Sequence, residues 1–191
     1  EWGAATMRHD VTGGFPDDWS GRRTINDAIR RVVPAIREVC DFAQSHGLKT
    51  SLENHGFYLQ ASQRVAKLID AVDHPNYGLT IDLGNFLCVN EEPTDAVKRL
   101  ATYVIMAHAK DFHVKSKRSA PDQPGAGWMR TPTEIALRGA IAGHGNVDLS
   151  QCVKLLKKAG YDGWLSLEFE GIEEPRRGVE LGLGYLRDLL G

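Results

Sequence analysis

The sequence predicts an α/β fold in which βα units surround a parallel sheet. Five short runs rich in aliphatic and β-branched residues alternate with stretches whose apolar residues recur at helical spacing, a pattern typical of parallel α/β folds. A (β/α)8 barrel, or TIM barrel, of ~250 residues uses about 31 residues per unit, so a chain of 191 residues holds roughly six units. We therefore expect an incomplete (β/α)8 barrel, an open sheet, or a barrel completed by a second copy.

The predicted strands are short and are separated by helical patterns. They comprise Ala4–His9, Leu48–Asn54, Leu79–Gly84, Tyr103–Ala109 and Trp164–Glu170. A long amphipathic helix is expected from Ile25 to Ala43, despite Pro34 within it. A second helix follows Ser62 as its N-cap, a third ends before Gly160, and a final helix runs from about Pro175 to Leu190.

One long stretch, from Phe112 to Val147, lacks clear periodicity and is predicted to be a loop. It contains the segment SAPDQPGAG at 119–127 and is expected to carry a short helix near Thr133–Leu137. Loops of this length in compact folds tend to be functional. Gly143 and Gly145 do not form a phosphate-binding loop, because no strand leads straight into them and the G-x-G-x-x-G spacing fails.

Composition excludes several classes of function. Lys and Arg number 23 against 25 Asp and Glu, a formal net charge of −2, unlike proteins that bind nucleic acid or anionic membranes by bulk charge. Three cysteines without a C-x-x-C pair favour free thiols in a reducing compartment. No apolar run approaches the ~18 residues of a membrane span, and no signal peptide is evident. We expect a cytoplasmic protein that binds neither nucleic acid nor membrane, with residues 1–191 in a single domain.

Four predicted strands contain, near their ends, a polar residue that interrupts an apolar run. These residues are Glu53 in SLENHG, Asp82 in TIDLGN, His108 in MAHAKD and Glu168 in SLEFE. A strand covered on both faces is nearly continuously hydrophobic, so a carboxylate inside it needs a partner that offsets its desolvation. One divalent metal ion is such a partner, and the strand ends of a barrel meet at the mouth, where active sites lie. Three carboxylates and one imidazole suit Mn²⁺, Mg²⁺ or Co²⁺, with Zn²⁺ as a further option.

Each of these residues taken alone also has a structural explanation, as a helix cap or a salt-bridge partner. Their coincidence across four strands favours the metal site. Glu170 has the same side-chain parity as Glu168. It therefore competes for the ligand role or, alternatively, pairs with Lys110 or solvent.

Further polar residues near the predicted mouth are candidates for substrate binding. His55 follows the second strand and either contacts substrate or is a structural histidine. Lys110 and Asp111 follow the fourth strand and are predicted to be a substrate contact and its orienting partner, with a surface ion pair as the alternative. Three residues close the first strand and either face the mouth or cap the strand: Arg8, His9 and Asp10.

Five motifs follow one another along the whole chain. They are SLENHG at 51–56, IDLGNF at 81–86, HAKD at 108–111, GHGNVD at 143–148 and GYDGWLSLEFEG at 160–171. Together they resemble the xylose isomerase-like superfamily of sugar phosphate isomerases and epimerases. The resemblance implies that the five strands are strands four to eight of a TIM barrel. The first three βα units, on the order of 90 residues, would then lie upstream in the natural protein, or another chain would cover the open edge.

The resemblance also implies a chemistry. Glu53, Asp82, His108 and Glu168 correspond to the ligands of one divalent metal ion. Glu53 and Glu168 also match the pair that, in ketose epimerases and related isomerases, moves a proton at the carbon beside the carbonyl. The implied activity is a metal-dependent isomerase or epimerase of a small sugar or polyol-derived substrate, acting through an enediolate. We assign four residues to substrate binding: His9, His55, Asn85 and Lys110.

The chain departs from the epimerase pattern at two positions, and other activities stay open. Asn85 stands where several epimerases have a substrate-binding His, and Val114 stands where they have an Arg. One alternative is a dehydratase with the same metal and base, and another is a phosphodiesterase resembling endonuclease four, which needs further His and acidic ligands. A third is a non-catalytic sugar-binding barrel, which would not require the pair Glu53 and Glu168. The expected partner is a small sugar-like molecule, with a homo-oligomer possible.

Overall fold

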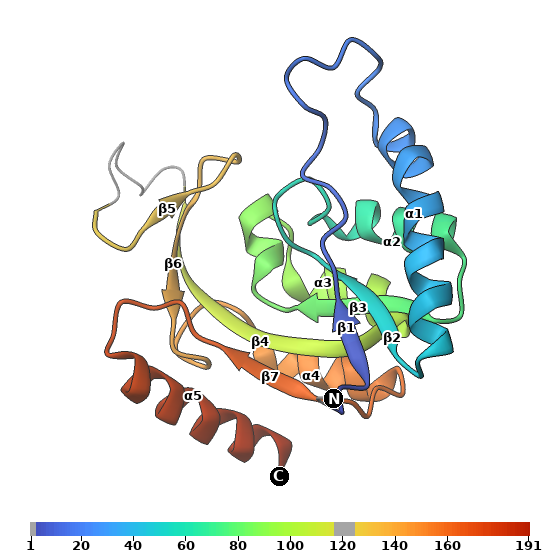
Figure 1. The fold of residues 1–191 in the computed structure, drawn as a ribbon. Helices are drawn as coiled ribbons and strands as arrows, with labels where there is room; N and C mark the ends of the chain where they lie inside the picture. The colour runs from blue at the N-terminus through green and yellow to red at the C-terminus, as the bar shows by residue number, and fades with distance from the viewer. Residues whose placement is uncertain (1–2, 117–124) are drawn as a thin grey trace.

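The computed structural model describes residues 3–116 and 125–191, and it shows a curled sheet with helices along its outer side (Figure 1). The elements, in chain order, are β1 (Thr6–Arg8), α1 (Ile25–Ser45), β2 (Lys49–Glu53), α2 (Ser62–Val72), β3 (Tyr77–Asp82), η1 (Asn85–Val89), α3 (Pro93–Leu100), η2 (Ala101–Tyr103), β4 (Val104–Lys115), β5 (Met129–Arg130), β6 (Ala136–Ala140), α4 (Leu149–Lys158), β7 (Leu165–Glu168) and α5 (Pro175–Leu190). Within these residues, no helix has the length and apolarity needed to cross a bilayer.

Five strands form the parallel part of the sheet, in the order β1-β2-β3-β4-β7. In the described part of the chain, β1 pairs only with β2 and β7 pairs only with β4, so both edges of this parallel sheet are open. The curled sheet and its outer helices form part of an α/β barrel (Figure 1). The predicted incomplete TIM barrel and all five predicted strands are therefore confirmed.

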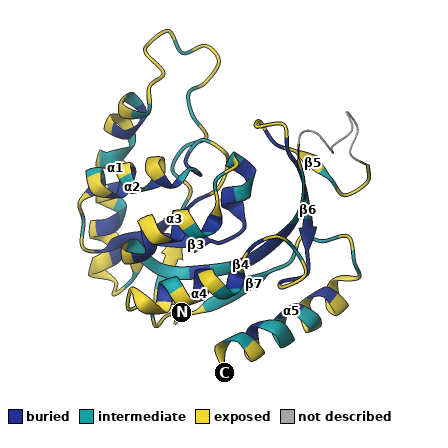
Figure 2. Ribbon diagram, turned by 180° about the vertical axis from the view of Figure 1, so that it is seen from behind, coloured by how far each residue is buried: buried dark blue, intermediate teal, exposed yellow. Residues whose placement is uncertain are grey.

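The helices cover the sheet through narrow apolar stripes, and Figure 2 shows buried residues on their inner faces and exposed residues on their outer faces. In α1 the stripe includes Ile29, Ile36 and Cys40, which are buried, whereas Pro34 is exposed. A capping box formed by Thr24 and Asp27 fixes the start of α1. The three cysteines are buried free thiols, as the sequence predicts.

The prediction of a long loop from Phe112 to Val147 is wrong in part. β4 continues to Lys115, β6 pairs with its outer half in antiparallel orientation, and β5 pairs with β6. The short helix expected near Thr133–Leu137 is absent, because this segment leads through a turn into β6. Residues 117–124 of the predicted loop lie outside the described residues. These three segments, β5, β6 and residues 111–115 of β4, form a small antiparallel sheet.

Tertiary packing explains why this segment is a strand. Periodicity cannot assign an apolar stretch of three or four residues to either helix or strand, and here Leu137 is buried in a small cluster with Phe112 and Cys88. A Cβ atom at Gly139 would lie 2.1 Å from the backbone oxygen of Glu170. Glycine therefore allows β6 to pass close to the segment that follows β7. The sequence prediction also lacks η1 and α3, which connect β3 to β4.

Asp111 ties the outer half of β4 to the loop that precedes α4. Its carboxylate is 1% exposed and accepts hydrogen bonds from the backbone N–H groups of Gly143, Gly145 and Val147, at 2.8 to 3.0 Å. Side chains of consecutive strand residues point to opposite faces, so Asp111 faces away from Lys110. The prediction that Asp111 orients Lys110 is therefore wrong, and this carboxylate holds the loop.

We expect Asp111→Ala to lower the free energy of unfolding by about 3 kcal/mol, because four backbone N–H donors lose their acceptor, and the bonds from Phe112 and Val147 are buried. Urea denaturation of the purified protein measures this change. Replacement of the exposed Asp162 by Ala is the matched control, with an expected change within about 0.5 kcal/mol. Equal midpoints for the two variants would contradict the proposed role of Asp111.

Candidate metal centre

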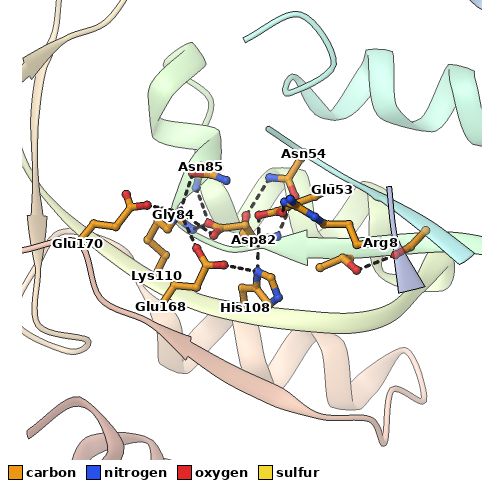
Figure 3. Close-up of polar contacts among 12 residues, drawn as sticks. Arg8, Glu53, Asn54, Asp82, Gly84, Asn85, His108, Lys110, Glu168 and Glu170 are labelled. Carbon is orange, nitrogen blue, oxygen red and sulfur yellow. Dashed lines mark hydrogen bonds and ion pairs between the residues drawn. The ribbon is translucent and has the colours of Figure 1, made fainter. Parts of the chain in front are cut away.

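Four side chains from four parallel strands meet at the carboxyl end of the sheet (Figure 3). Glu53 ends β2, Asp82 ends β3, His108 lies in β4 and Glu168 ends β7. Each offers one ligand atom, and the four atoms lie within 4.8 Å of one another. Asp82 and His108 are direct register partners, and Glu53 and Glu168 come from the flanking strands. The four residues that interrupt apolar runs in the sequence are therefore neighbours in space.

Asp82 is fully buried and held from two sides. Its Oδ1 atom accepts hydrogen bonds from the backbone N–H groups of Gly84 and Asn85, both at 2.8 Å. The side chain of Asn54 donates to the backbone oxygen of Asp82 at 2.8 Å and accepts from its N–H at 2.7 Å. These bonds fix the carboxylate, and they direct Oδ2 toward the other three ligands.

The two glutamates reach the same nitrogen of His108 from β2 and β7, the strands on either side of β3 and β4. Nδ1 of His108 lies 2.8 Å from Oε1 of Glu168 and 3.5 Å from Oε1 of Glu53. The second oxygen of each glutamate contacts a cation: Oε2 of Glu168 lies 2.7 Å from the Lys110 ammonium, and Oε2 of Glu53 pairs with the Arg8 guanidinium. Each glutamate thus has one oxygen toward the centre of the cluster and one oxygen on a cation.

The cluster fits a divalent metal ion. Oδ2 of Asp82 and Nδ1 of His108 are buried and have no hydrogen-bond partner, although charged groups lie near both. Buried polar atoms without a partner are rare, and a metal ion would satisfy both. Three carboxylates with one imidazole form a donor set rich in hard oxygen ligands, which suits Mg²⁺ and Mn²⁺.

Burial and mutual charge perturb the acid–base equilibria of the cluster. Burial raises the pKa of Asp82 to about 7, against the influence of Lys110 and with that of Glu168. Contact with His108, and then with Lys110, lowers the pKa of Glu168 to about 2. For His108, burial favours a lower pKa, but the carboxylates of Glu168 and Glu53 outweigh burial and raise it to about 9. Without a metal, His108 is therefore protonated at neutral pH.

Two of the predicted substrate-binding residues lie beside the cluster. His55 is exposed and lines a cavity of about 110 Å³ that also includes Glu53, Asp10 and Thr12. Asn85 is 3% exposed. Its Nδ2 atom has no hydrogen-bond partner, and its Oδ1 atom lies 3.5 Å from the Lys110 ammonium. Both residues stay candidates for contact with a polar substrate.

The other two predicted substrate-binding residues, Lys110 and His9, lie in different places relative to the cluster. Lys110 lies within the cluster, but its ammonium is surrounded by carboxylates that include Glu170, at 3.4 Å. His9 lies outside the cluster, and its ring packs against Tyr77. Arg8 reaches Glu53 in its place, because consecutive residues of β1 point to opposite faces. This alternation shows only that one of the two residues faces the cluster, and the pairing of β1 with β2 determines that it is Arg8.

An incomplete α/β barrel with potential metal ligands at the carboxyl ends of its strands has the layout of a TIM-barrel enzyme. The family model described as xylose isomerase-like TIM barrel matches residues 3–189. Because this match covers nearly the whole chain, the protein belongs to the xylose isomerase-like TIM barrel family.

Three relatives of this chain share 20 to 25% of its residues in the aligned regions. It is similar to the inosose dehydratase of Clostridium botulinum, with 22% identity over 80% of this chain and 52% of that protein. It is also similar to the inosose isomerase of Halalkalibacterium halodurans, with 25% identity over 73% of this chain and 45% of that protein. A solved xylose isomerase-like TIM barrel protein from Mycobacterium smegmatis, in complex with magnesium, aligns with a TM-score of 0.70 and 20% identity over 98% of this chain and 61% of that one. The chain spans about half the length of these curated relatives.

We expect the stability of the metal-free protein to fall as pH rises from about 6.5 to about 9. The pKa of His108 is raised to about 9 from its ordinary value of 6.5, so its contribution is complete below the lower value and is lost as pH passes the upper one. Urea midpoints at pH 6, 8 and 9.5 measure the slope. The His108→Gln variant should have a flatter profile, and identical slopes for both proteins would contradict the assignment.

Proposed function

We propose that the protein is a metal-dependent isomerase or epimerase of a small sugar or polyol-derived substrate. The observation that carries this proposal is that Glu53 and Glu168, from the strands on either side of β3 and β4, reach the same nitrogen of His108 inside a cluster that fits a divalent metal ion. Two carboxylates facing one reacting centre can remove a proton from one side and return it from the other. The distant inosose isomerase supports this class of chemistry.

The four clustered residues would hold the metal ion, which when bound polarises a carbonyl group and its neighbouring hydroxyl. One of the two glutamates takes the proton from the carbon beside the carbonyl, and the electron pair of that C–H bond forms the enediolate. The other glutamate must carry a proton when the cycle starts, and its donation of that proton to the opposite face of the same carbon gives the epimer. Return of the proton to the adjacent carbon instead gives the isomer.

Substrate contacts would come from the residues around the cluster. His55 lines the small cavity next to Glu53, and the unpartnered amide of Asn85 can donate to a substrate oxygen. Both groups suit hydroxyl and carbonyl oxygens, which agrees with a sugar-like substrate. We retain them as proposed substrate-binding residues, and His9 is not among them because it packs against Tyr77.

A dehydratase is the second candidate. The similarity to an inosose dehydratase favours it, and the first step is shared: a carboxylate removes a proton beside a carbonyl. The pathways diverge afterwards, since a dehydratase expels a hydroxyl as water in place of returning the proton. A multinuclear zinc phosphodiesterase has less support, because residues 3–116 and 125–191 contain a single group of potential metal ligands, the four residues above.

We expect His108→Ala to weaken Mn²⁺ binding by about 100-fold or more, since loss of a direct ligand should exceed the 10–100-fold cost of losing a supporting residue. Calorimetric titration of the metal-stripped protein measures the affinity. His74→Ala is the matched control, because His74 pairs with Asp41 on the surface. Unchanged affinity in the His108 variant would rule out the proposed ligand set.

We expect Glu53→Gln and Glu168→Gln to lose far more turnover than metal affinity, because each side chain is proposed to move a proton as well as bind the metal. The loss of turnover should reach about 10²- to 10⁴-fold, the usual contribution of a general acid or base. Incorporation of solvent deuterium beside the carbonyl, measured on a panel of ketoses and inososes, reports the proton transfer. Glu180→Gln serves as the exposed control. Turnover of a ketose by the unaltered protein without deuterium exchange would favour a hydride shift.

A further inference from the structure

The carboxylates of the cluster share one arrangement: each has one oxygen engaged outside the group and one oxygen turned into it. For Asp82 the outer partners are backbone N–H groups. For the two glutamates the outer partners are cations, Lys110 for Glu168 and Arg8 for Glu53. Figure 3 shows these two cations on opposite sides of the ligands. Neither Lys110 nor Arg8 is a proposed metal ligand. Their positions beside the two glutamates therefore need a separate explanation.

Lys110 is a costly residue to place here. Its side chain is 5% exposed, and burial of an ammonium group is unfavourable unless opposite charges surround it. Its Nζ atom lies 2.7 Å from Glu168, 3.3 Å from Asp82 and 3.4 Å from Glu170. All the strong contacts of this buried cation are therefore made with carboxylates, and two of these belong to the proposed ligands.

Arg8 occupies the corresponding position beside Glu53 but is more accessible. Its side chain is 42% exposed, and among residues 3–116 and 125–191 its one ion pair beyond that with Glu53 is a long contact with Asp10, at 3.9 Å. The two glutamates thus have similar surroundings, one cation being buried and the other partly open to solvent. This difference makes Arg8 the position at which a substitution is better tolerated by the fold.

We propose that Arg8 and Lys110 are positioning residues that keep Glu53 and Glu168 as single-oxygen ligands of the metal. A carboxylate free to rotate can bind a divalent cation through both oxygens. The cation on Oε2 opposes that rotation and leaves this oxygen off the metal, where it can exchange a proton with substrate. This inference rests on the proposed function and assigns the two cations a role through the glutamates.

The proposal predicts that removal of a side chain beside the cluster strengthens metal binding. Loss of the Lys110 ammonium removes a positive charge beside the metal and frees Oε2 of Glu168 to bind it, and both effects strengthen metal binding. We expect Lys110→Met to bind Mn²⁺ about tenfold more tightly or better, since the variant lacks the positive charge that would repel the metal ion from a few ångströms away. If Lys110 only supported the fold, the same variant would bind the metal more weakly.

The experiment uses Co²⁺ as a spectroscopic probe and Mn²⁺ as an affinity probe, on the whole chain. Visible absorption of Co²⁺ weakens as its coordination number rises, so a glutamate that turns bidentate gives a weaker band. We expect weaker absorption and tighter Mn²⁺ binding for Lys110→Met, and the same changes to a smaller extent for Arg8→Met. Arg8→Lys should restore the spectrum of the unaltered protein.

Two controls make the outcome decisive. Lys98→Met removes a lysine from an exposed pair with Asp95 and should change neither probe. If Lys110→Met does not fold, Arg8→Met and Arg8→Lys still test the proposal at the partly exposed position. Unchanged absorption would overturn the positioning role even with tighter Mn²⁺ binding, as would weaker binding, and the proposed function would stand. Absence of Co²⁺ binding by the unaltered protein would overturn both.

Discussion

Repulsion among three carboxylates at one end of the sheet is the constraint on which the rest of the structure depends. Glu53, Asp82 and Glu168 present oxygens within 4.8 Å of one another. Two like charges roughly 4 Å apart repel by about 4 kcal/mol even at an effective dielectric constant of 20. A fold that places them together must supply positive charges and oriented hydrogen-bond donors at the same place.

The fold meets this constraint with parts of different kinds. Parallel pairing brings the carboxyl ends of four strands to one edge, and strand alternation turns one polar residue from each toward the centre. The backbone N–H groups at the start of η1 hold Asp82, whereas His108, Lys110 and Arg8 bring positive charge to the two glutamates. A bound metal ion would take the place of the His108 proton, so the four clustered residues and the surrounding cations are best considered as one unit.

The four clustered residues were predictable because each one, a charged or ring side chain, interrupts an apolar run in the sequence. A charged or ring side chain within an apolar strand is conspicuous without any knowledge of the fold. Arg8 was not, because the choice between Arg8 and His9 depends on the register that pairs Arg8 with Ser51, and no local pattern reveals that register. The small antiparallel sheet of β5, β6 and residues 111–115 of β4 was also missed. Its strand β6 owes its conformation to pairing with β4, which lies far from it in the sequence, and no local pattern reveals that pairing.

Two adjacent residues of β4 illustrate how much depends on order as well as composition. Lys110 points into the cluster of carboxylates, and Asp111 points to the other face, where three backbone N–H groups bind it. Exchange of the two residues would keep the composition and net charge of the chain. It would also place a fourth carboxylate among the three and set an ammonium against hydrogen-bond donors. The sequence Lys-Asp, and not Asp-Lys, thus determines which face of this strand can be the floor of the site.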